Sequence, residues 1–374
     1  MHLQNLKLID FRNYTDLYIE FNKDINLIIG KNGQGKTNIV EAIYLMSIGK
    51  SFRTNKDKEI IKFEKEKLYL AGNYQNKNNS SLIEFIIDKN KKGIRLNKIS
   101  INKISELLGN LNVVIFSPED LKLIKDGPRE RRNFIDKEIS QISPRYYNLL
   151  IDYNNILNQK NKYLKNTNLD HNLLDVYDEK LSSFGYEIYI FRKEFINKLN
   201  NIAKDIHNKL TNCGENLEIT YKTKIESNDL DSKEKIKDNL FNKIKSYRNN
   251  DIKTRMTTFG IHRDDLDIYI NNFEAKTFGS QGQQRMASIS IKLSEIELIK
   301  REIGEYPILI LDDVFSELDE NRQKMLIDSL KGIQIFVTTA EKSHKNIFNK
   351  EITTIFSIEK GQVVKIENGG KLNE

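Results

Sequence analysis

The segment "GKNGQGKT", residues 30–37, constrains the fold more than any other part of the sequence, and it follows the short apolar run "INLII". Its glycines permit backbone conformations in which successive N–H groups point at one anion. The next segment, "NIVEAIYLM", has helical spacing, so the positive end of that helix would face the same anion. A strand, a glycine-rich loop and a helix in this order predict a P-loop that holds a nucleoside triphosphate within an α/β domain.

The side chains of the loop have expected roles. Lys36 would place its positive charge on the β and γ phosphates, and Thr37 would offer its hydroxyl to Mg²⁺. The predicted nucleotide-binding residues of this segment are Gly30, Lys31, Asn32, Gly33, Gln34, Gly35, Lys36, Thr37 and Asn38.

The run "PILILDDVF" supplies the carboxylates that a Mg²⁺-nucleotide site needs. Its apolar residues 308–311 predict a parallel strand buried on both faces, and ligands bind at the C-terminal ends of such strands. We expect Asp312 to hold Mg²⁺ directly or through water, and Asp313 to orient or deprotonate the attacking water. The predicted catalytic residues are therefore Lys36, Asp312 and Asp313, and the predicted metal ligands are Thr37 and Asp312.

A second anion site is predicted in "FGSQGQQRMASISIKLSEIELI". Ser280 can cap a helix whose first N–H groups are left free for a ligand. One nucleotide does not need two such helix ends from one chain, so this end would serve the γ-phosphate of a second copy's nucleotide. A simple N-cap with a polar turn explains the segment equally well when it is taken alone.

Composition and charge set further limits. A single cysteine, Cys213, excludes a disulfide framework and a multi-cysteine metal site. The sequence has no apolar run of about 18 residues and no secretory pattern at its N-terminus, so we expect a cytoplasmic protein without a membrane partner. The net charge of +7 favours nucleic acid as a partner, but lysine-rich composition throughout the chain explains the charge as well.

The sequence changes character twice along its length. Residues 1–118 and 254–374 contain short apolar runs typical of strands, whereas residues 119–253 are charged and have mainly helical spacing. This pattern predicts an α/β domain split into 1–118 and 254–374, with a mainly helical lobe, 119–253, inserted in its middle. One segment of that lobe, "LEITYKTKI" at 217–225, is compatible with a strand.

Together these motifs resemble an ABC-type ATPase of the SMC-like kind, in which two heads clamp two ATP molecules. More specifically, the chain is similar to the bacterial RecF family along essentially its whole length. The resemblance rests on "LQNLKLIDFRNY", "GKNGQGKTNIVEAIYLMSIGKSFRT", "IFSPEDLKLIKDGPRERRNFID", "FGIHRDDLDIYIN", "FGSQGQQR" and "DDVFSELDENR". It implies an ABC-type P-loop ATPase head, with a mixed sheet and an antiparallel β subdomain, and an inserted, mainly helical second lobe.

The resemblance also implies a function. Ser280, Gly282 and Gln283 match the signature that reaches ATP across a dimer, and "SELD" at 316–319 resembles the D-loop along that interface. The family's role is recombinational repair, replication restart and SOS induction. An ATP-dependent homodimer would bind single-stranded, gapped or duplex DNA, help RecO and RecR load RecA, and leave after ATP hydrolysis with Mg²⁺.

Four positions depart from common patterns. Asp313 stands where transport ATPases usually have Glu, and Thr338 and Thr339 stand where a switch His is usual. Both differences favour weak, slow hydrolysis, and the resemblance implies that this hydrolysis depends on DNA. Ile261 in "GIHRDD" replaces the family's usual Pro, and we expect only a local backbone effect.

Two basic clusters are candidate DNA contacts, because their side chains can neutralise DNA phosphates. One lies in "GKSFRT", just after the P-loop helix, and the other in "DGPRERRNFID", near a helix start that Pro128 favours. A solvated or internally paired basic face explains either cluster as well. The candidate residues are Lys50, Arg53, Arg129, Arg131 and Arg132.

Two other classes of protein share some of these features. A transport ATPase subunit would use the same nucleotide motifs, but the sequence has no evident membrane-coupling segment. An SMC-type tether would need a long coiled coil, and the helical lobe lacks a sustained heptad pattern.

Overall fold

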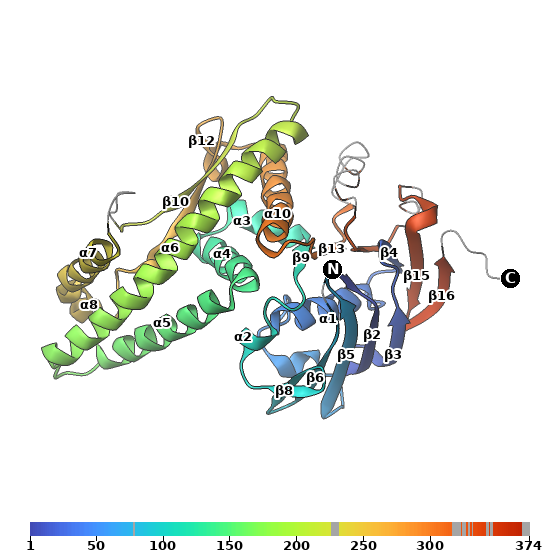
Figure 1. Cartoon of the computed structure of the whole chain (residues 1–374), viewed down its shortest axis with the longest axis horizontal. Coiled ribbons are helices and arrows are strands. Elements are labelled where there is room, and N and C mark those ends of the chain that lie inside the picture. Colours follow the sequence, from blue (N-terminus) through green and yellow to red (C-terminus); the bar gives the residue numbers. More distant parts are fainter. Residues whose placement is uncertain are drawn as a thin grey trace. The chain divides into compact units, whose positions relative to one another are not determined.

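The computed structural model describes residues 1–77, 79–225, 232–315, 323, 327, 330, 332–341, 344 and 347–368. The chain forms two compact units, one of residues 1–120 with 295–374 and one of residues 121–294 (Figure 1). Within the described ranges, each helix is too short or too polar to cross a lipid bilayer.

A mainly parallel sheet forms the centre of the first unit. Its order is β16-β15-β4-β14-β13-β9, and β16 alone among these strands is antiparallel to its neighbour. Its central strands are apolar and fully buried, as expected where both faces of a parallel sheet are covered. The strands are β4 (Ile25–Ile29), β9 (Val113–Phe116), β13 (Ile308–Asp312), β14 (Ile335–Thr339), β15 (Thr353–Glu359) and β16 (Gln362–Asn368).

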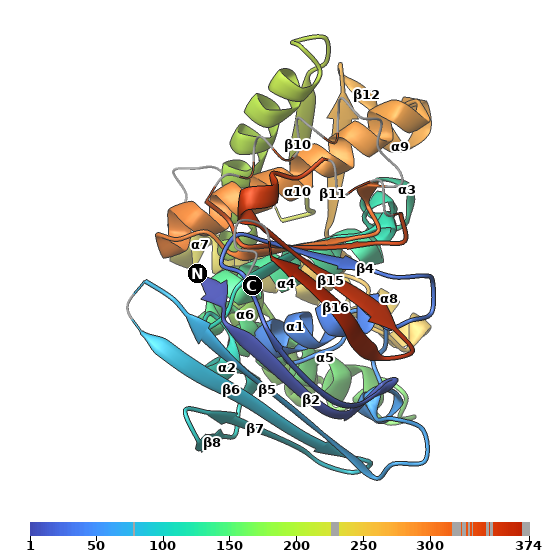
Figure 2. The same ribbon diagram turned by 90° about the vertical axis from the view of Figure 1, so that its right-hand side faces the viewer.

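An antiparallel sheet forms the second layer of this unit (Figure 2). Its order is β3-β2-β5-β6-β7-β8, and β1 also pairs with β5. The strands are β1 (His2–Leu3), β2 (Asn5–Phe11), β3 (Tyr14–Glu20), β5 (Lys67–Gln75), β6 (Ser80–Asp88), β7 (Lys92–Leu96) and β8 (Ile99–Ile101).

Helix α1 (Lys36–Ile48) lies between the two sheets, where it contacts β9, β13 and β14 on one side and β6 on the other. It therefore buries apolar side chains around most of its circumference rather than along one stripe. The core of the unit is formed by these side chains and the inner faces of both sheets. Shorter helical segments of this part of the chain are η1 (Asp57–Ile60), α2 (Ile104–Leu107), η2 (Pro118–Leu121) and η6 (Lys350–Ile352).

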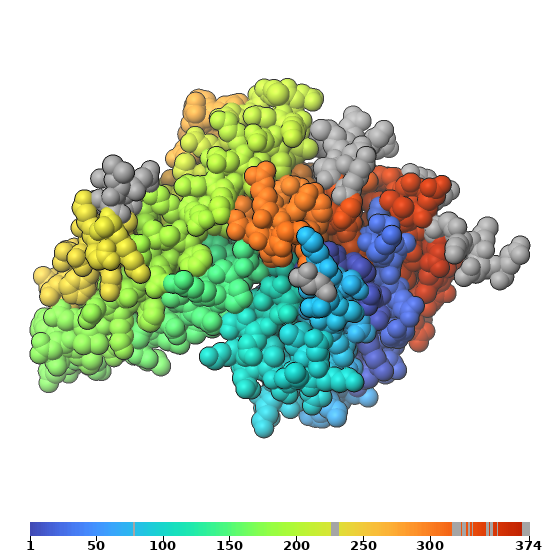
Figure 3. Space-filling view, in the orientation of Figure 1, coloured from blue at the N-terminus to red at the C-terminus, as the bar shows by residue number. Residues whose placement is uncertain are grey.

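The second unit is built around the long helix α6 (His171–Leu210), whose surface can be followed in green in Figure 3. Leu174, Leu181 and Ile188 begin a buried apolar row along α6, but Asp178, Gly185 and Arg192 interrupt the second buried row, so the helix has no sustained apolar heptad. Helices α5 (Pro144–Tyr163) and α7 (Lys233–Ser246) pack against α6. The other helices described in this unit are α3 (Lys122–Lys125), α4 (Pro128–Ile142), α8 (Arg248–Thr254), η3 (Ile261–Arg263), α9 (Ala275–Phe278) and the first part of α10 (Gln281–Ile303).

Charged side chains are buried inside this unit and are paired there. The Arg192 guanidinium lies 2.8 Å from an Asp136 oxygen and donates to the carbonyl of Ile261. Lys160 lies 2.8 Å from Asp178 and 2.9 Å from Asp251. Each of these cations has at least one acceptor within hydrogen-bond distance, as buried charges require.

A three-stranded antiparallel sheet completes the second unit. Strand β10 (Leu217–Lys222) pairs along its whole length with β11 (Asp265–Ile270), and β11 also pairs with β12 (Phe273–Glu274). This pairing is why residues 254–294 pack with the second unit, although their motifs group them with the head. The domain limits 1–118 with 254–374 and 119–253 stay a prediction.

Candidate functional site

The loop at 30–37 joins β4 to α1, and its geometry depends on glycine at two positions. Gly33 has φ 78° and Gly35 has φ 114°, in the region that residues with a side chain rarely adopt. A Cβ on Gly35 would also lie within 2.9 Å of the side chains of Asn13 and Tyr14. The loop is therefore packed closely against the β2–β3 turn.

That turn supports the loop through hydrogen bonds. Asn13 donates its amide N–H to the carbonyl of Gln34 at 2.9 Å, and Tyr14 donates its hydroxyl to the carbonyl of Gly35 at 3.1 Å. Asn38 in the first turn of α1 donates to Asn13 at 2.7 Å. The "FRNY" segment thus holds the shape of the loop, a role that local sequence reasoning about the loop missed.

Lys36 folds back over the loop. Its Nζ donates to the carbonyl of Gly30 at 2.7 Å and to that of Lys31 at 3.1 Å. Burial lowers the pKa of Lys36, and the charges of Asp313 and Asp312 oppose this shift. A bound polyphosphate would favour the charged ammonium in the same way.

The structure brings Thr37 and Asp312 together from opposite ends of the sequence. Thr37 Oγ1 donates to Asp312 Oδ1 at 3.1 Å, and Thr338 Oγ1 donates to the same oxygen at 2.6 Å. Burial raises the pKa of Asp312, while the two hydroxyl donors oppose that rise. A hydroxyl and a carboxylate at this spacing are the hard oxygen donors that Mg²⁺ prefers, so the residues present fit the predicted metal.

Asp313 is exposed and has an unusual backbone conformation. Its φ of 57° is left-handed, and its N–H donates to Thr338 Oγ1 at 3.1 Å. Non-glycine residues in this conformation are uncommon and cluster at functional sites. Here the bend comes directly after β13, so Asp312 and Asp313 leave the strand end in different environments.

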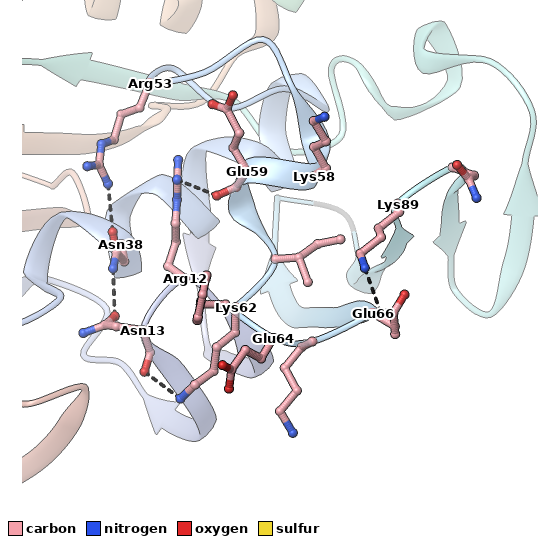
Figure 4. Close-up of a pocket in the computed structure, with 14 residues that line it drawn as sticks. Arg12, Asn13, Asn38, Arg53, Lys58, Glu59, Lys62, Glu64, Glu66 and Lys89 are labelled. Carbon is pink, nitrogen blue, oxygen red and sulfur yellow. Dashed lines mark hydrogen bonds and ion pairs between the residues drawn. The ribbon is translucent and has the colours of Figure 1, made fainter.

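Two cavities adjoin the loop. The smaller, of about 350 Å³, brings the loop together with Asp313 and Thr338, two residues distant in sequence. The larger, of about 930 Å³, lies beside the β2–β3 turn and includes Lys62 and Phe63 in its lining (Figure 4). Asn38 and Arg53 line both cavities, which makes the two neighbours along the start of α1.

Glu41 organises the basic side chains at this boundary. It is fully buried on α1 and accepts from Arg12 Nη2 at 2.5 Å, from Ser51 at 2.5 Å and from Arg53 at 3.2 Å. Sequence reasoning missed Glu41 and Arg12. The available signal was a lone carboxylate within the apolar run "NIVEAIYLM", which a buried helix retains only when the charge is paired.

The two residues of the first basic cluster, Lys50 and Arg53, lie in different surroundings. Arg53 also donates to Asn38 Oδ1 at 2.8 Å, so it lies at the cavity of about 350 Å³ while remaining partly exposed. Lys50 is exposed just after α1. A DNA contact stays a prediction for both residues.

The second basic cluster is mostly engaged within the second unit. Arg131 is buried and forms a two-pronged pair with Asp265 at 2.6 and 2.9 Å, and Arg132 donates to the carbonyl of Asp264 at 2.7 Å. For these two residues the structure favours the alternative of internal pairing. Arg129 is exposed on the first turn of α4 and remains accessible for a DNA contact.

The signature segment forms the exposed start of α10. Gln283 donates its backbone N–H to Ser280 Oγ at 3.2 Å, and Ser280 donates its backbone N–H to Gln283 Oε1 at 2.9 Å. This reciprocal pair is a capping box, so the predicted N-cap at Ser280 is confirmed. Gly282 is exposed, and a Cβ there would meet little.

The remaining predicted positions behave as follows. The "SELD" segment, 316–319, lies outside the described residues. Thr338 bonds Asp312 as stated above, and Thr339 Oγ1 lies 2.8 Å from His344 Nδ1. His262 is half-buried, with its ring nitrogens 2.7 Å from the Tyr153 hydroxyl and 3.1 Å from the carbonyl of Thr257.

Comparison with protein families and known sequences gives one consistent result. A family model described as "RecF/RecN/SMC N terminal domain" matches residues 2–363. The "DNA replication and repair protein RecF" of Clostridioides difficile is 58% identical over 370 residues, covering 99% of this chain and all of that protein. The protein of the same name from Alkaliphilus oremlandii is 45% identical over 364 residues, covering 97% of this chain and all of its own length.

Solved structures agree with the sequences. A structure described as "recombination mediator protein RecF-ATP in RecFOR pathway" superposes with a TM-score of 0.90 at 36% identity, covering 98% of this chain and 97% of its own. An SMC head domain bound to a domain of ScpA superposes with a TM-score of 0.55 at 17% identity, covering 98% and 97% of the two chains. The ABC-type ATPase fold expected from the sequence is confirmed.

Proposed function

Because the chain belongs to the RecF family, we propose that it is an ATP-dependent DNA-binding switch in DNA replication and repair. The observation that carries this proposal is the convergence of Lys36, Thr37 and Asp312 at one glycine-rich loop, combined with an exposed, capped helix start at Ser280 on the other unit. The first group fits the phosphates and Mg²⁺ of one ATP. The second is an exposed helix start, which would supply the anion-binding half of a shared site.

The nucleotide would occupy both cavities beside the loop. The phosphates fit the 350 Å³ cavity, with the loop N–H groups and Lys36 around them. The base and ribose would extend into the 930 Å³ cavity past Asn38 and Arg53, toward the exposed ring of Phe63. Arg12 and Arg53, held by Glu41, would then place two fixed positive charges beside the phosphate chain.

Hydrolysis would depend on the bound Mg²⁺ and on the carboxylate of Asp313. Mg²⁺ held by Thr37 and Asp312 would neutralise charge that develops on the phosphates. Asp313 would orient the attacking water or accept its proton, since it is exposed at the same strand end and lines the phosphate cavity. An aspartate reaches less far than a glutamate, which favours the slow hydrolysis expected of a switch, and DNA would stimulate that hydrolysis.

Two copies would share each ATP. Ser280, Gly282 and Gln283 of one copy would contact the γ-phosphate held by the loop of the other copy, and the ATP would act as a bridge between them. The resulting homodimer would grip single-stranded, gapped or duplex DNA in the cytoplasm and release it after hydrolysis. The family's name and the RecFOR pathway support RecO and RecR as partners in loading RecA, with replication restart and SOS induction as the consequences.

The test is DNA binding with and without ATP, measured across a range of salt concentrations on single-stranded, duplex and gapped DNA. We expect ATP to raise the affinity at least about tenfold, and the salt dependence to report phosphate contacts. Lys36→Arg should abolish the ATP effect and the ATP-driven dimer on a sizing column. The charge remains, but the larger planar group cannot take the place of Nζ between the carbonyls of Gly30 and Lys31.

Lys7→Arg, an exposed substitution on β2, is the matched control and should behave as the wild type. Equal binding to all three DNA forms with no effect of ATP would refute the switch. Dimers that form in the Lys36→Arg variant as readily as in the wild type would refute the ATP bridge.

A further inference from the structure

The side chain of Gln283 in the signature segment is held from two sides. Its Oε1 accepts the backbone N–H of Ser280 at 2.9 Å, and its Nε2 donates to Glu215 Oε1 at 3.0 Å. Glu215 lies in the segment between the end of α6 and the start of β10, far from the signature in sequence. A carboxylate therefore fixes the orientation of the amide that closes the capping box.

Glu215 also lies against the end of α6. Its second oxygen, Oε2, lies 3.3 Å from Nε2 of His207, a fully buried residue in the last turn of that helix. The other ring nitrogen, Nδ1, lies 2.9 Å from Ser290 Oγ, and Ser290 donates its hydroxyl to the carbonyl of Met286. The chain of contacts thus runs from the first turn of α10 through Glu215 and His207 back to the third turn of α10.

The backbone beside Glu215 is fixed as well. Asn216 donates its N–H to Asn271 Oδ1 at 2.8 Å, and Asn271 donates its N–H to the carbonyl of Asn216 at 2.9 Å. These bonds attach the segment to the turn between β11 and β12, and β10 pairs with β11 directly after it. The end of α6, the turn before β12 and the start of α10 lie at the same end of this unit (Figure 1). Glu215 therefore has a rigid support.

We propose that Glu215 is a positioning residue for the signature half of the shared nucleotide site, acting through the side-chain amide of Gln283. This proposal rests on the proposed ATP-bridged dimer. With the amide fixed, the capping box is closed, and the exposed residues Ser280, Gln281 and Gly282 are kept in one arrangement at the start of α10. Preorganised donors bind an anion more tightly because no ordering is needed at the moment of binding.

The same geometry explains why a carboxylate can accept the hydrogen bond from Gln283 so close to a phosphate site. A carboxylate close to a phosphate would repel it, but here the carboxylate contacts the far end of a neutral amide and a histidine lies against its other oxygen. Glu215 can therefore orient the amide of Gln283 while its own negative charge stays away from the phosphate. A glutamine at position 215 would retain an acceptor oxygen for Gln283, whereas an alanine would not.

The experiment compares the wild type with Glu215→Ala and Glu215→Gln as full-length chains. Sedimentation velocity with ATPγS and Mg²⁺ measures the dimer dissociation constant, and a fluorescent ATP analogue at low protein concentration measures binding to the monomer. Glu215→Ala should raise the dimer dissociation constant on the order of tenfold, because the signature segment would then have to be ordered when the dimer forms. Its monomer should bind the nucleotide as the wild type does, because the loop at 30–37 is untouched.

Two controls make the result specific. Glu218→Ala removes the same charge from an exposed position on β10 and should leave the dimer constant within about threefold of the wild type. Glu215→Gln should do the same, because it keeps the acceptor. Amide hydrogen exchange of residues 280–284 without nucleotide should be faster in Glu215→Ala alone, a readout that does not depend on dimerisation.

The outcomes separate this proposal from the function it rests on. A wild-type protein that stays monomeric with ATPγS would refute the shared site. In that case, unchanged exchange at 280–284 in Glu215→Ala would also refute the positioning role. If the wild type dimerises, the proposal is overturned when Glu215→Ala dimerises equally well, or when Glu215→Gln is as defective as Glu215→Ala.

Discussion

Glu41 shows how one buried carboxylate can determine the shape of a binding site. It is fully buried on α1, yet it accepts hydrogen bonds from Arg12, Ser51 and Arg53, two of which line the larger cavity. The arginines remain partly exposed, so their charges are available to a ligand while their positions are set from inside the protein. The helix that carries Lys36 and Thr37 thus also positions the cations beside them.

Glu41→Gln should therefore weaken both folding and nucleotide binding. The amide keeps one acceptor oxygen but turns an NH₂ group toward arginine donors, so at least one arginine loses its partner. We expect a loss of about 1–3 kcal/mol in the free energy of unfolding, measured in urea, and weaker binding of a fluorescent ATP analogue. Glu20→Gln, an exposed change on β3, is the control. Wild-type affinity for the analogue in Glu41→Gln would show that the arginines do not contact the nucleotide.

The buried Asp264 and the half-buried His262 are near each other in the sequence, and their titrations have opposite effects on stability. Burial raises the pKa of Asp264 from 3.8 to about 6 and lowers the pKa of His262 from 6.5 to about 4. Between about pH 4 and 6 the folded protein keeps a proton on Asp264 that the unfolded chain releases, so this group stabilises the fold less as the pH rises. The folded protein lacks a proton on His262 that the unfolded chain binds, so this group stabilises the fold more as the pH rises.

The two effects should nearly cancel in the wild type and become visible in variants. Asp264→Asn should lose stability on acidification from pH 6.5 to 4.5 more steeply than the wild type, by up to about 1.4 kcal/mol per pH unit. His262→Gln should lose less than the wild type over the same range. Urea unfolding at several pH values measures both slopes, and identical slopes in all three proteins would contradict the assignment of the two pKa shifts.

At the scale of elements, the loop between β4 and α1 depends on its surroundings as much as on its own sequence. Gly33 and Gly35 both have positive φ, but a Cβ on Gly33 would meet nothing within 4 Å, whereas a Cβ on Gly35 would contact Asn13 and Tyr14. The two glycines can therefore be compared directly. Gly33 is constrained by its backbone conformation alone, and Gly35 is constrained by both its conformation and its packing.

Gly35→Ala should abolish nucleotide binding, while Gly33→Ala should weaken it less. Alanine in a left-handed conformation costs roughly 1–2 kcal/mol, and at position 35 the displacement of the β2–β3 turn adds to that cost. Isothermal titration with ATP and Mg²⁺ measures the difference between the variants. Equal affinities in the two variants would show that the turn does not support the loop.

The elements predicted from sequence and those missed differ for a physical reason. The strands β4 and β13, the helices α5 and α6, strand β10 and the cap at Ser280 were predicted because their signals are local. The support of the loop by Asn13 and Tyr14 and the contact of Glu215 with Gln283 join segments that only the folded chain brings together. Pairing across long separations leaves no local period in the sequence.

The limits of the two compact units also depend on pairing between segments that are distant in the sequence. Residues 254–294 carry motifs of the ATPase head, but β11 pairs with β10 from the lobe and thereby draws this stretch into the second unit. Composition changes near residue 254 could not reveal that pairing. The long motifs, in contrast, identified the family directly from the sequence, and the structural comparisons confirmed it.

At the scale of the whole molecule, the proposed dimer requires that each complete ATP site takes its loop from one copy and its signature from another. Lys36→Ala removes the first half and Ser280→Arg removes the second, so each variant alone would form only incomplete sites. When the two variants are mixed, a pair made of one copy of each has one complete site, formed by the loop of the Ser280→Arg copy and the signature of the Lys36→Ala copy.

The most direct measurement is therefore ATP hydrolysis by the two variants, alone and in an equimolar mixture, at concentrations where the wild type dimerises. The account predicts little activity for either variant alone. It predicts roughly a quarter of the wild-type rate for the mixture, because about half of the pairs are mixed and each has one complete site of two. A mixture no more active than the sum of its parts, or full activity of Ser280→Arg alone, would contradict the claim.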